Sequence, residues 1–404
     1  MEIKKNRVFG GVLLVAGTAI GAGMIALPIT SGLGGFIPSV VLMVSCWIYM
    51  TITAFLFLEA TLWFERDVNI VSIAEHTLGL FGKAISWVVY LFLLYALTTA
   101  YLSGCGALFL DSMQQIGNFT LPKWIGPIPF LFLFGLCVYL GTKPVDYINR
   151  AFMLGLVVTF LSLIFVSFPH VKGVYLEQTS WKLIWPSLAV VVTSFGYHII
   201  IPSLSYYLGY RVALLKKTLF LGGLIPLVVY LFWQIITLGL IPAHGAQSFA
   251  LLSKSPQAET LFISVMDANI SSVKIGEIFR FFSYFAILTS FLGVTLSLSD
   301  FLADGFKIKK NARGRFFITL LTFLPPLFFA LAFPNVFISA LKYAAIFVAI
   351  LLGIMPAAIV WSGRYKLKME SKFKVMGGKF LLSFIILISF AIIAVVIWEQ
   401  VFAH

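Results

Sequence analysis

The chain has 404 residues, of which 61% are hydrophobic and only 11% are charged. Its mean hydropathy is +1.03, and a soluble protein of this length needs far more charge to stay in solution. Apolar runs of about 20 residues recur along the sequence, and each is long enough to cross the ~30 Å hydrocarbon core of a bilayer. The composition therefore predicts an all-α polytopic membrane protein.

The net charge of +13 does not indicate a nucleic-acid partner. The basic residues occur in short clusters between apolar runs, as signals of membrane topology do. Cys46, Cys105 and Cys137 lie inside apolar runs and far apart, which excludes a disulfide framework and metal-ligand spacing. We therefore expect no cofactor and no obligate protein partner.

Eleven transmembrane helices are predicted by the length rule. They cover residues 8–32, 36–63, 84–111, 125–141, 148–169, 185–208, 216–241, 274–303, 315–333, 336–361 and 378–402. Because the loops are short, residues 1–404 are expected to form one membrane domain. In the longest loop, residues 247–252 are expected to form a short helix over an entrance.

The distribution of Lys and Arg predicts the orientation. The amino terminus and the loops after the even-numbered spans hold 21 of the 28 basic residues, whereas the opposite side holds 5. The positive-inside rule then places the amino terminus in the cytoplasm and the carboxyl terminus outside. The basic stretch 364–379 is expected near anionic lipid headgroups, although topology alone also explains it.

The first span carries Gly17, Gly21 and Gly23 at mid-membrane depth, followed by Pro28. Each glycine disfavours continued helix by ~1 kcal/mol and lets the backbone pass close to a ligand. Gly17 and Gly21 alone would also fit a helix-packing face. The additional Gly23 and Pro28 favour a discontinuous helix.

The sixth span contains Gly196, His198 and Pro202 within seven residues. Pro202 has no N–H and clashes with the carbonyl four residues earlier, that of His198. An irregular backbone at this depth is tolerated only against protein or a water-filled cavity. A second interruption is therefore predicted here.

The two interrupted spans begin two sets of five, at about residues 8–169 and 185–361, with one extra helix at about 378–402. Because each set has an odd number of spans, the second is inverted relative to the first. Paired interruptions in matching spans are the best sequence indication of a transporter site.

Four sequence segments carry a resemblance to a known family: residues 17–24, 193–198, 201–204 and 289–304. They resemble the hydroxy/aromatic amino acid permease family, whose tyrosine-specific members look most similar and whose tryptophan permeases come second. The resemblance covers nearly the whole chain. It implies a LeuT-like inverted repeat in a bacterial inner membrane, and cation-coupled import of an aromatic amino acid by alternating access.

The half-helix that starts near Gly21 offers free N–H groups and a positive dipole end to a substrate carboxylate. Carbonyl groups left free at the breaks are suited to bind the ammonium group of the same substrate. Phe195 and Tyr197 are expected to line a pocket for the ring. Since the LeuT-like class commonly uses a tyrosine on the third span, Tyr101 is chosen there, with Tyr95 as its competitor. The predicted substrate-binding residues are Thr18, Gly21, Ala22, Gly23, Tyr101, Ser194, Phe195, Gly196, Tyr197 and His198.

The coupled ion stays open between a transported proton and a bound sodium ion. His198 has an ordinary pKa near 6.5, so it could carry a proton, or it could donate a fixed hydrogen bond. Thr289 and Ser290 resemble the hydroxyl pair that holds sodium in LeuT-like carriers, together with backbone near Gly17. The alternative is that both hydroxyls bond carbonyls of their own helix. Residues 151–169 lack the lysine that several proton-driven relatives carry.

Other functions fit the sequence less well. No span has a filter motif or a stripe of charge, as a channel requires. Neither a catalytic cluster nor a phosphate-binding loop is present, which argues against a membrane enzyme or a primary pump. Transport of tryptophan or another neutral amino acid, and exchange in place of symport, remain alternatives.

Overall fold

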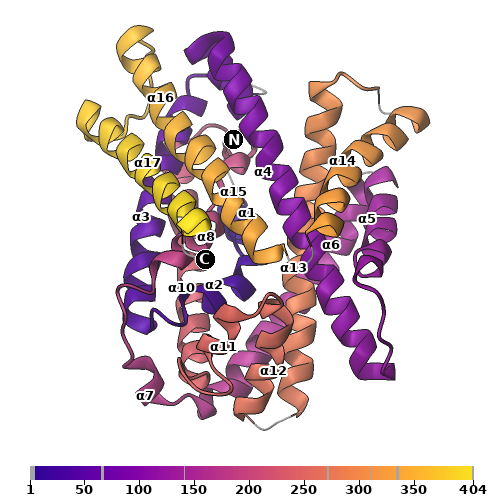
Figure 1. Cartoon of the computed structure of the whole chain (residues 1–404). Coiled ribbons are helices and arrows are strands. Elements are labelled where there is room, and N and C mark those ends of the chain that lie inside the picture. The colour runs from indigo at the N-terminus through magenta and orange to yellow at the C-terminus, as the bar shows by residue number, and fades with distance from the viewer. Residues whose placement is uncertain are drawn as a thin grey trace.

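The computed structural model describes residues 5–64, 68–140, 142–270, 273–309, 311–333 and 336–402, and most of them are helical (Figure 1). Ten helices within these ranges are long and apolar enough to cross a membrane, and α1 (Lys5–Ala19) and α2 (Gly23–Ser31) add an eleventh span as a bent pair. The predicted all-α chain with eleven spans is confirmed. Residue 141, the predicted end of the fourth span, lies outside the described residues.

The spans follow one another along the chain with short connections. The first five are the α1/α2 pair, α3 (Phe36–Thr61), α4 (Ile70–Gly117), α5 (Ile128–Leu140) and α6 (Thr142–Ser167). The next four are the pair α8 (Leu188–Ser194) and α9 (Ile201–Tyr207), then α10 (Val212–Leu240), α13 (Val273–Gly305) and α14 (Ala312–Ala332). The tenth runs continuously through α15 (Phe337–Val348), η5 (Ala349–Ile354), α16 (Met355–Trp361) and η6 (Ser362–Lys366), and the last is α17 (Gly378–Phe402).

Three short turns extend neighbouring spans: η1 (Lys123–Ile125) precedes α5 and brings the fourth span to Lys123–Leu140, η2 (Phe168–His170) follows α6, and η3 (Trp185–Ser187) precedes α8. The connections contain α7 (Gly173–Leu176), α11 (Phe249–Lys254) and α12 (Ala258–Ile270). The short helix expected at 247–252 is present as α11. A Cβ on Gly32 would overlap the Phe249 ring, so α11 packs closely on α2. The second helix of this loop, α12, was not predicted, because 13 residues are too few to span a bilayer.

Helix α4 begins earlier than the third span predicted at 84–111. Asn69 caps its first turn by accepting the Ser72 N–H, and the Ser72 hydroxyl accepts the Asn69 N–H in return. Gly79 then leaves the helical conformation with φ 74°, which a residue without a Cβ adopts readily. The residues before Gly79 therefore form a separate helical segment that leads into the span.

Both predicted interruptions are present. Helices α1 and α2 meet at 53° across residues 20–22. Helix α8 ends at Ser194, and regular helix resumes through η4 (His198–Ile200). Pro202 lies in the first turn of α9, where its missing N–H has no intrahelical partner to lose.

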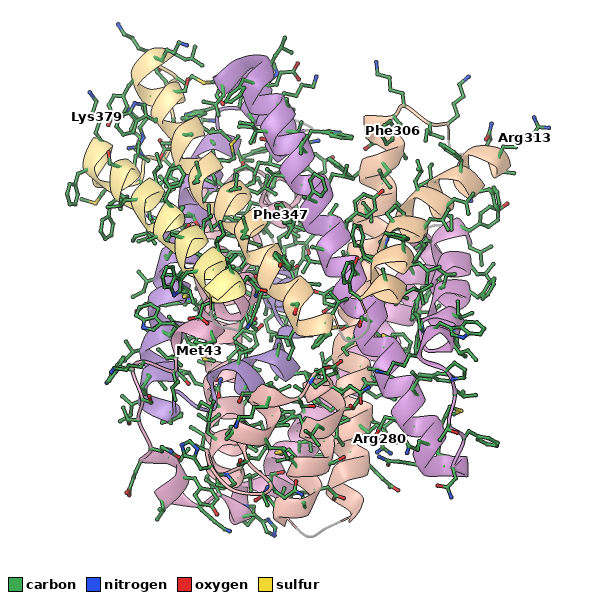
Figure 2. All side chains as sticks on the ribbon, viewed as in Figure 1. Met43, Arg280, Phe306, Arg313, Phe347 and Lys379 are labelled. Carbon is green, nitrogen blue, oxygen red and sulfur yellow. The ribbon has the colours of Figure 1, made fainter. Side chains whose placement is uncertain are left out.

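The interrupted helices lie in the middle of the molecule (Figure 1). Helix α1 packs against α10, α8 packs against α2 and α15, and α13 packs against α4 and α6. Phe306, Arg313 and Lys379 lie toward one end of the molecule, and Arg280 lies toward the other (Figure 2). The loops that carry most of the predicted cytoplasmic charge therefore share one end.

A buried ion pair fastens the connection between η6 and α17 to α3. Glu59 is fully buried, and its Oε1 accepts from Arg364 Nε at 2.6 Å. The backbone of Val375 completes the cluster, because its N–H donates to Glu59 at 2.8 Å and its carbonyl accepts from Arg364 at 2.8 Å. A charge pair that is both buried and fully hydrogen-bonded fixes its surroundings, since removing one partner leaves an uncompensated charge.

Candidate functional site

A cavity of about 420 Å³ lies where the two interrupted spans meet. Helices α1, α2, α4, α6, α8, α13 and α15 all contribute to its wall. Its volume lies in the range of small-molecule sites, which are ~300–1,000 Å³. The cavity is therefore large enough for an amino acid.

Most of the predicted site residues line this cavity. They are Gly17, Thr18, Gly21, Ala22, Gly23, Tyr101, Ser194, Gly196, Thr289 and Ser290. Phe195, Tyr197 and His198 do not line it, and all three are completely buried. Of the two candidate tyrosines on α4, Tyr101 faces the cavity, whereas Tyr95 donates to the carbonyl of Leu321 at 2.9 Å.

The first break contacts α13 directly. The Ala22 N–H donates to the Ser290 hydroxyl at 3.2 Å, and the Tyr101 hydroxyl lies close to the same group. A Cβ on Gly21 would overlap the Ser290 oxygen. Only glycine at position 21 permits this close approach of the two helices.

The two breaks also contact each other. A Cβ on Gly23 would overlap the hydroxyl of Ser194, at the end of α8. That hydroxyl donates to the Val190 carbonyl at 2.8 Å. The first turn of α2 has no side-chain cap. The Met24 and Ile25 N–H groups already donate to the Gly21 and Ala22 carbonyls at 2.9 and 3.2 Å. The Gly23 amide at the cavity wall is therefore the group of this turn that is suited to bind an anion.

Three backbone carbonyls near the breaks accept hydrogen bonds from side chains of α10. The Tyr230 hydroxyl lies 2.7 Å from the Ala19 carbonyl and 3.2 Å from the Ser194 carbonyl. Trp233 Nε1 donates to the Met24 carbonyl at 2.7 Å, which lacks the usual N–H partner four residues later because that residue is Pro28. Sequence analysis missed both residues because the seventh span has no break. The only available signal was that a buried Tyr or Trp needs a hydrogen-bond partner.

His198 lies behind the cavity wall and faces α3. Its Nε2 is 2.8 Å from the Thr53 hydroxyl, which also donates to the Met50 carbonyl at 3.0 Å. Because Thr53 has one hydrogen, this arrangement favours His198 as the Nε2–H donor. Its Nδ1 is buried and has no hydrogen-bond partner among the described residues.

Thr289 and Ser290 both bond carbonyls one turn back in α13. Thr289 donates to the Phe285 carbonyl at 2.9 Å, and Ser290 donates to the Ala286 carbonyl at 3.2 Å. The alternative considered for this pair is therefore the geometry observed. Ser290 additionally accepts the Ala22 N–H of the first break. The pair therefore still places oxygen atoms at the cavity wall.

Asn149 on α6 is a further polar residue at the cavity wall that sequence analysis did not select. Its Oδ1 is buried and has no hydrogen-bond partner in the described part of the chain. Met153, one turn further along α6, would lie 3.4 Å from a Cβ on Gly17. A polar residue inside the fifth span was the available signal for this position.

The cavity extends from the breaks toward one end of the molecule. Leu13 and Leu14 line it before the first break, and Gly293, Val294 and Ser297 line it beyond Ser290. These residues lie on the side where α1 begins and α13 ends. On the opposite side, a Cβ on Gly104 would lie 2.9 Å from the Phe337 ring, and helices α11 and α12 pack on α2. The cavity is thus closed on that side by close packing.

Comparison with known proteins identifies the family. The sequence profile of the tryptophan/tyrosine permease family matches residues 4–397. The chain belongs to the tryptophan/tyrosine permease family. It is a multi-pass membrane protein of a family of amino acid permeases, as the resemblance in its sequence indicated.

Individual permeases are similar over nearly their whole length. The chain is 33% identical to the tyrosine-specific transport system 2 of Haemophilus influenzae, covering 97% of this chain and 96% of that protein. It is 33% identical to the tryptophan-specific transport protein of the same organism, over 96% and 94%. It is 32% identical to the low affinity tryptophan permease of Escherichia coli, over 98% and 96%.

The contacts of Gly21 and Gly23 generate a prediction. Gly21→Ala or Gly23→Ala should reduce uptake to about a tenth of the parent rate or less, because an overpacked methyl costs about 1–3 kcal/mol. Initial uptake would be measured at matched membrane abundance. Gly135→Ala is the control, since its Cβ would meet only Thr319 at 3.8 Å. Near-normal uptake in both variants would leave these glycines with a role in helix packing alone.

Helix α12, on the closed side, contains the buried carboxyl group of Glu259. Its Oε1 has no hydrogen-bond partner within the described ranges, and burial raises the pKa of Glu259 from 4.5 to about 7. Since the folded protein binds the proton more tightly than the unfolded chain, the free energy of unfolding should fall as pH rises from 4.5 through 7.

Glu259→Gln should remove this dependence on pH. The variant should match the parent melting temperature at pH 5 and exceed it at pH 8, measured by tryptophan fluorescence in detergent. Glu277→Gln is the control, because Glu277 is exposed on the neighbouring α13. If the melting temperature of Glu259→Gln changes between pH 5 and pH 8 as much as that of the parent, Glu259 is not the source of the pH dependence.

Proposed function

We propose that this permease is a secondary active transporter that imports an aromatic amino acid, with tyrosine as the first candidate. Import would occur by cation-coupled symport with alternating access. The observation that carries the proposal is the cavity that joins the uncapped start of α2 to the second break. The names of the relatives support an aromatic substrate, since they include tyrosine-specific and tryptophan-specific transport proteins.

The cavity offers distinct partners to each part of such a substrate. The amide groups near Gly21 to Gly23 suit the carboxylate, with the Tyr101 hydroxyl beside them. Polar groups of Ser194 and Thr193 face the cavity near the second break and suit the ammonium group. Apolar residues of α4, α15 and η5 form a wall that suits the ring: Leu93, Leu97, Leu341, Val348 and Leu352.

In this proposal, Phe195 and Tyr197 support the cavity wall from its buried side. The Phe195 ring contacts the Tyr230 ring edge-on at a centroid distance of 5.5 Å. Tyr197 packs against Gly223 of α10, where a Cβ would lie 3.0 Å from its hydroxyl oxygen. Both rings thereby hold the backbone of the second break, and their contact with the substrate ring would require a rotation of this segment.

The direction of the cavity suggests a transport state. It extends to the end of the molecule where the basic loops lie, which the charge distribution predicts to be cytoplasmic. We accordingly propose an inner-membrane protein in an inward-facing state, with the amino terminus inside and the carboxyl terminus outside. Closing of α1 against α13 would then accompany reorientation.

For the coupled cation, we propose a proton, with His198 as its candidate carrier. The imidazole is the ionisable group at the second break, and its Nδ1 has no partner among the described residues. Sodium is the second candidate, because the hydroxyls of Thr289 and Ser290 and the carbonyl of Ala286 gather beside the first break. Oxygen ligands of this kind, with the Gly17 backbone, would suit a hard cation.

Counterflow into proteoliposomes loaded with unlabelled tyrosine tests the substrate. Labelled tyrosine should accumulate transiently, and unlabelled tryptophan and phenylalanine should compete with it at least about tenfold better than serine, because the apolar wall gains from a ring. The matched control is the Gly23→Ala variant in the same vesicles. If unlabelled serine competes as well as unlabelled tyrosine, the substrate is a neutral amino acid in general and not an aromatic one.

Thr289→Val separates the two cations, since Thr289 lines the cavity while its hydroxyl, among the described residues, bonds only carbonyls of its own helix. With a coupled proton, uptake driven by a pH gradient should stay within about twofold of the parent, because a self-bonded hydroxyl contributes little. The control is Thr295→Val, a buried hydroxyl bonded to the Phe291 carbonyl at 2.7 Å. If uptake by the parent depends on sodium, and Thr289→Val needs a higher sodium concentration for the same uptake, the coupled cation is sodium.

A further inference from the structure

Two helix ends converge inside the membrane region. Helix α1 ends at Ala19 and α8 ends at Ser194, and each end leaves carbonyls without the next turn of helix to satisfy them. Both ends also carry the negative pole of their helix dipole. Two such ends repel each other unless a hydrogen-bond donor or a cation lies between them.

Tyr230 supplies this donor from a third helix. Its hydroxyl lies 2.7 Å from the Ala19 carbonyl and 3.2 Å from the Ser194 carbonyl, so one hydrogen is shared by the two helix ends. The side chain is completely buried. A phenylalanine would fill nearly the same volume, so the hydroxyl itself adds the link between the two breaks.

The neighbouring turn of α10 holds the other side of the first break. Trp233 donates to the Met24 carbonyl at 2.7 Å, three residues along from Tyr230 and on the same helix face. The Trp233 ring stacks on Phe279 of α13 at 5.7 Å. One face of α10 is thus bonded to the first span before its break and after it.

We propose that Tyr230 is a positioning residue that joins the two breaks into one rigid unit through its hydroxyl. The unit sets the distance between the amides of the first break and the backbone of the second. A zwitterionic substrate that binds both would depend on this distance. The transport readout of this inference rests on the proposed function, whereas its structural readout does not.

The test compares Tyr230→Phe with Tyr49→Phe in the full chain. Tyr49 is also a buried tyrosine, and its hydroxyl is bonded to Ser389 at 2.7 Å, but it does not line the cavity. In Tyr230→Phe, hydrogen–deuterium exchange should accelerate at the amides of both residues 20–24 and residues 195–198. In Tyr49→Phe, exchange at these two segments should equal that of the parent.

Counterflow of tyrosine gives the functional readout. The KM of Tyr230→Phe should rise about tenfold, the factor expected for loss of one buried hydrogen bond, while Tyr49→Phe stays within about twofold. Faster exchange at only one break, or at neither, would overturn the proposal. If hydrogen–deuterium exchange accelerates at both breaks in Tyr230→Phe but the parent does not transport tyrosine, the proposed function is wrong and the structural proposal stands.

Replacement of Tyr230 by p-aminophenylalanine keeps the ring and restores a donor. This variant should return both exchange rates and the KM toward parental values. It also keeps the proposal testable if Tyr230→Phe does not fold, because the donor should then rescue folding. A p-aminophenylalanine variant that behaves like Tyr230→Phe would assign Tyr230 a packing role and overturn the proposal.

Discussion

A helix that stops inside a bilayer leaves N–H and carbonyl groups without intrahelical partners, and no water in the hydrocarbon can replace them. This chain stops two helices there, at Ala19 and Ser194, and restarts them within a few residues. Other helices then satisfy the freed groups. Tyr230 bonds the Ala19 and Ser194 carbonyls, and Ser290 accepts the Ala22 N–H. Trp233 bonds the Met24 carbonyl, which Pro28 leaves without an N–H partner. The positions of α10 and α13 around the breaks follow from this requirement.

The same requirement accounts for the cavity. Groups that neither side chains nor backbone satisfy are left facing the space between the helices, and the Gly23 amide at the start of α2 is the clearest case among the described residues. Gly21 and Gly23 allow this backbone to approach Ser290 and Ser194 without a Cβ between them. A binding surface made largely of backbone can hold the common part of any amino acid. In the proposed function, specificity is then left to the side chains of the apolar wall.

Local sequence signals predicted the breaks and the spans, because glycine, proline and apolar length act at their own positions. They did not predict Tyr230 or Trp233, since a donor on an unbroken helix is recognised only once its partner is placed. Asn149 was missed although its polar side chain inside the fifth span was a usable signal. The irregular turn after Ser194 had a further consequence. Its backbone rotation could not be derived from spacing, and the structure turns Phe195, Tyr197 and His198 behind the cavity wall while Gly196 faces it.

The cluster of Glu59, Arg364 and Val375 lies away from the cavity but bears on how the chain can be shortened. Val375 belongs to the connection that precedes α17, and its backbone closes the hydrogen-bond network of a completely buried carboxylate. A deletion that starts after α16 would remove not only a lipid-facing helix but also the donors that keep this charge satisfied. The boundary tolerated by a truncation or a fused reporter therefore lies beyond residue 375.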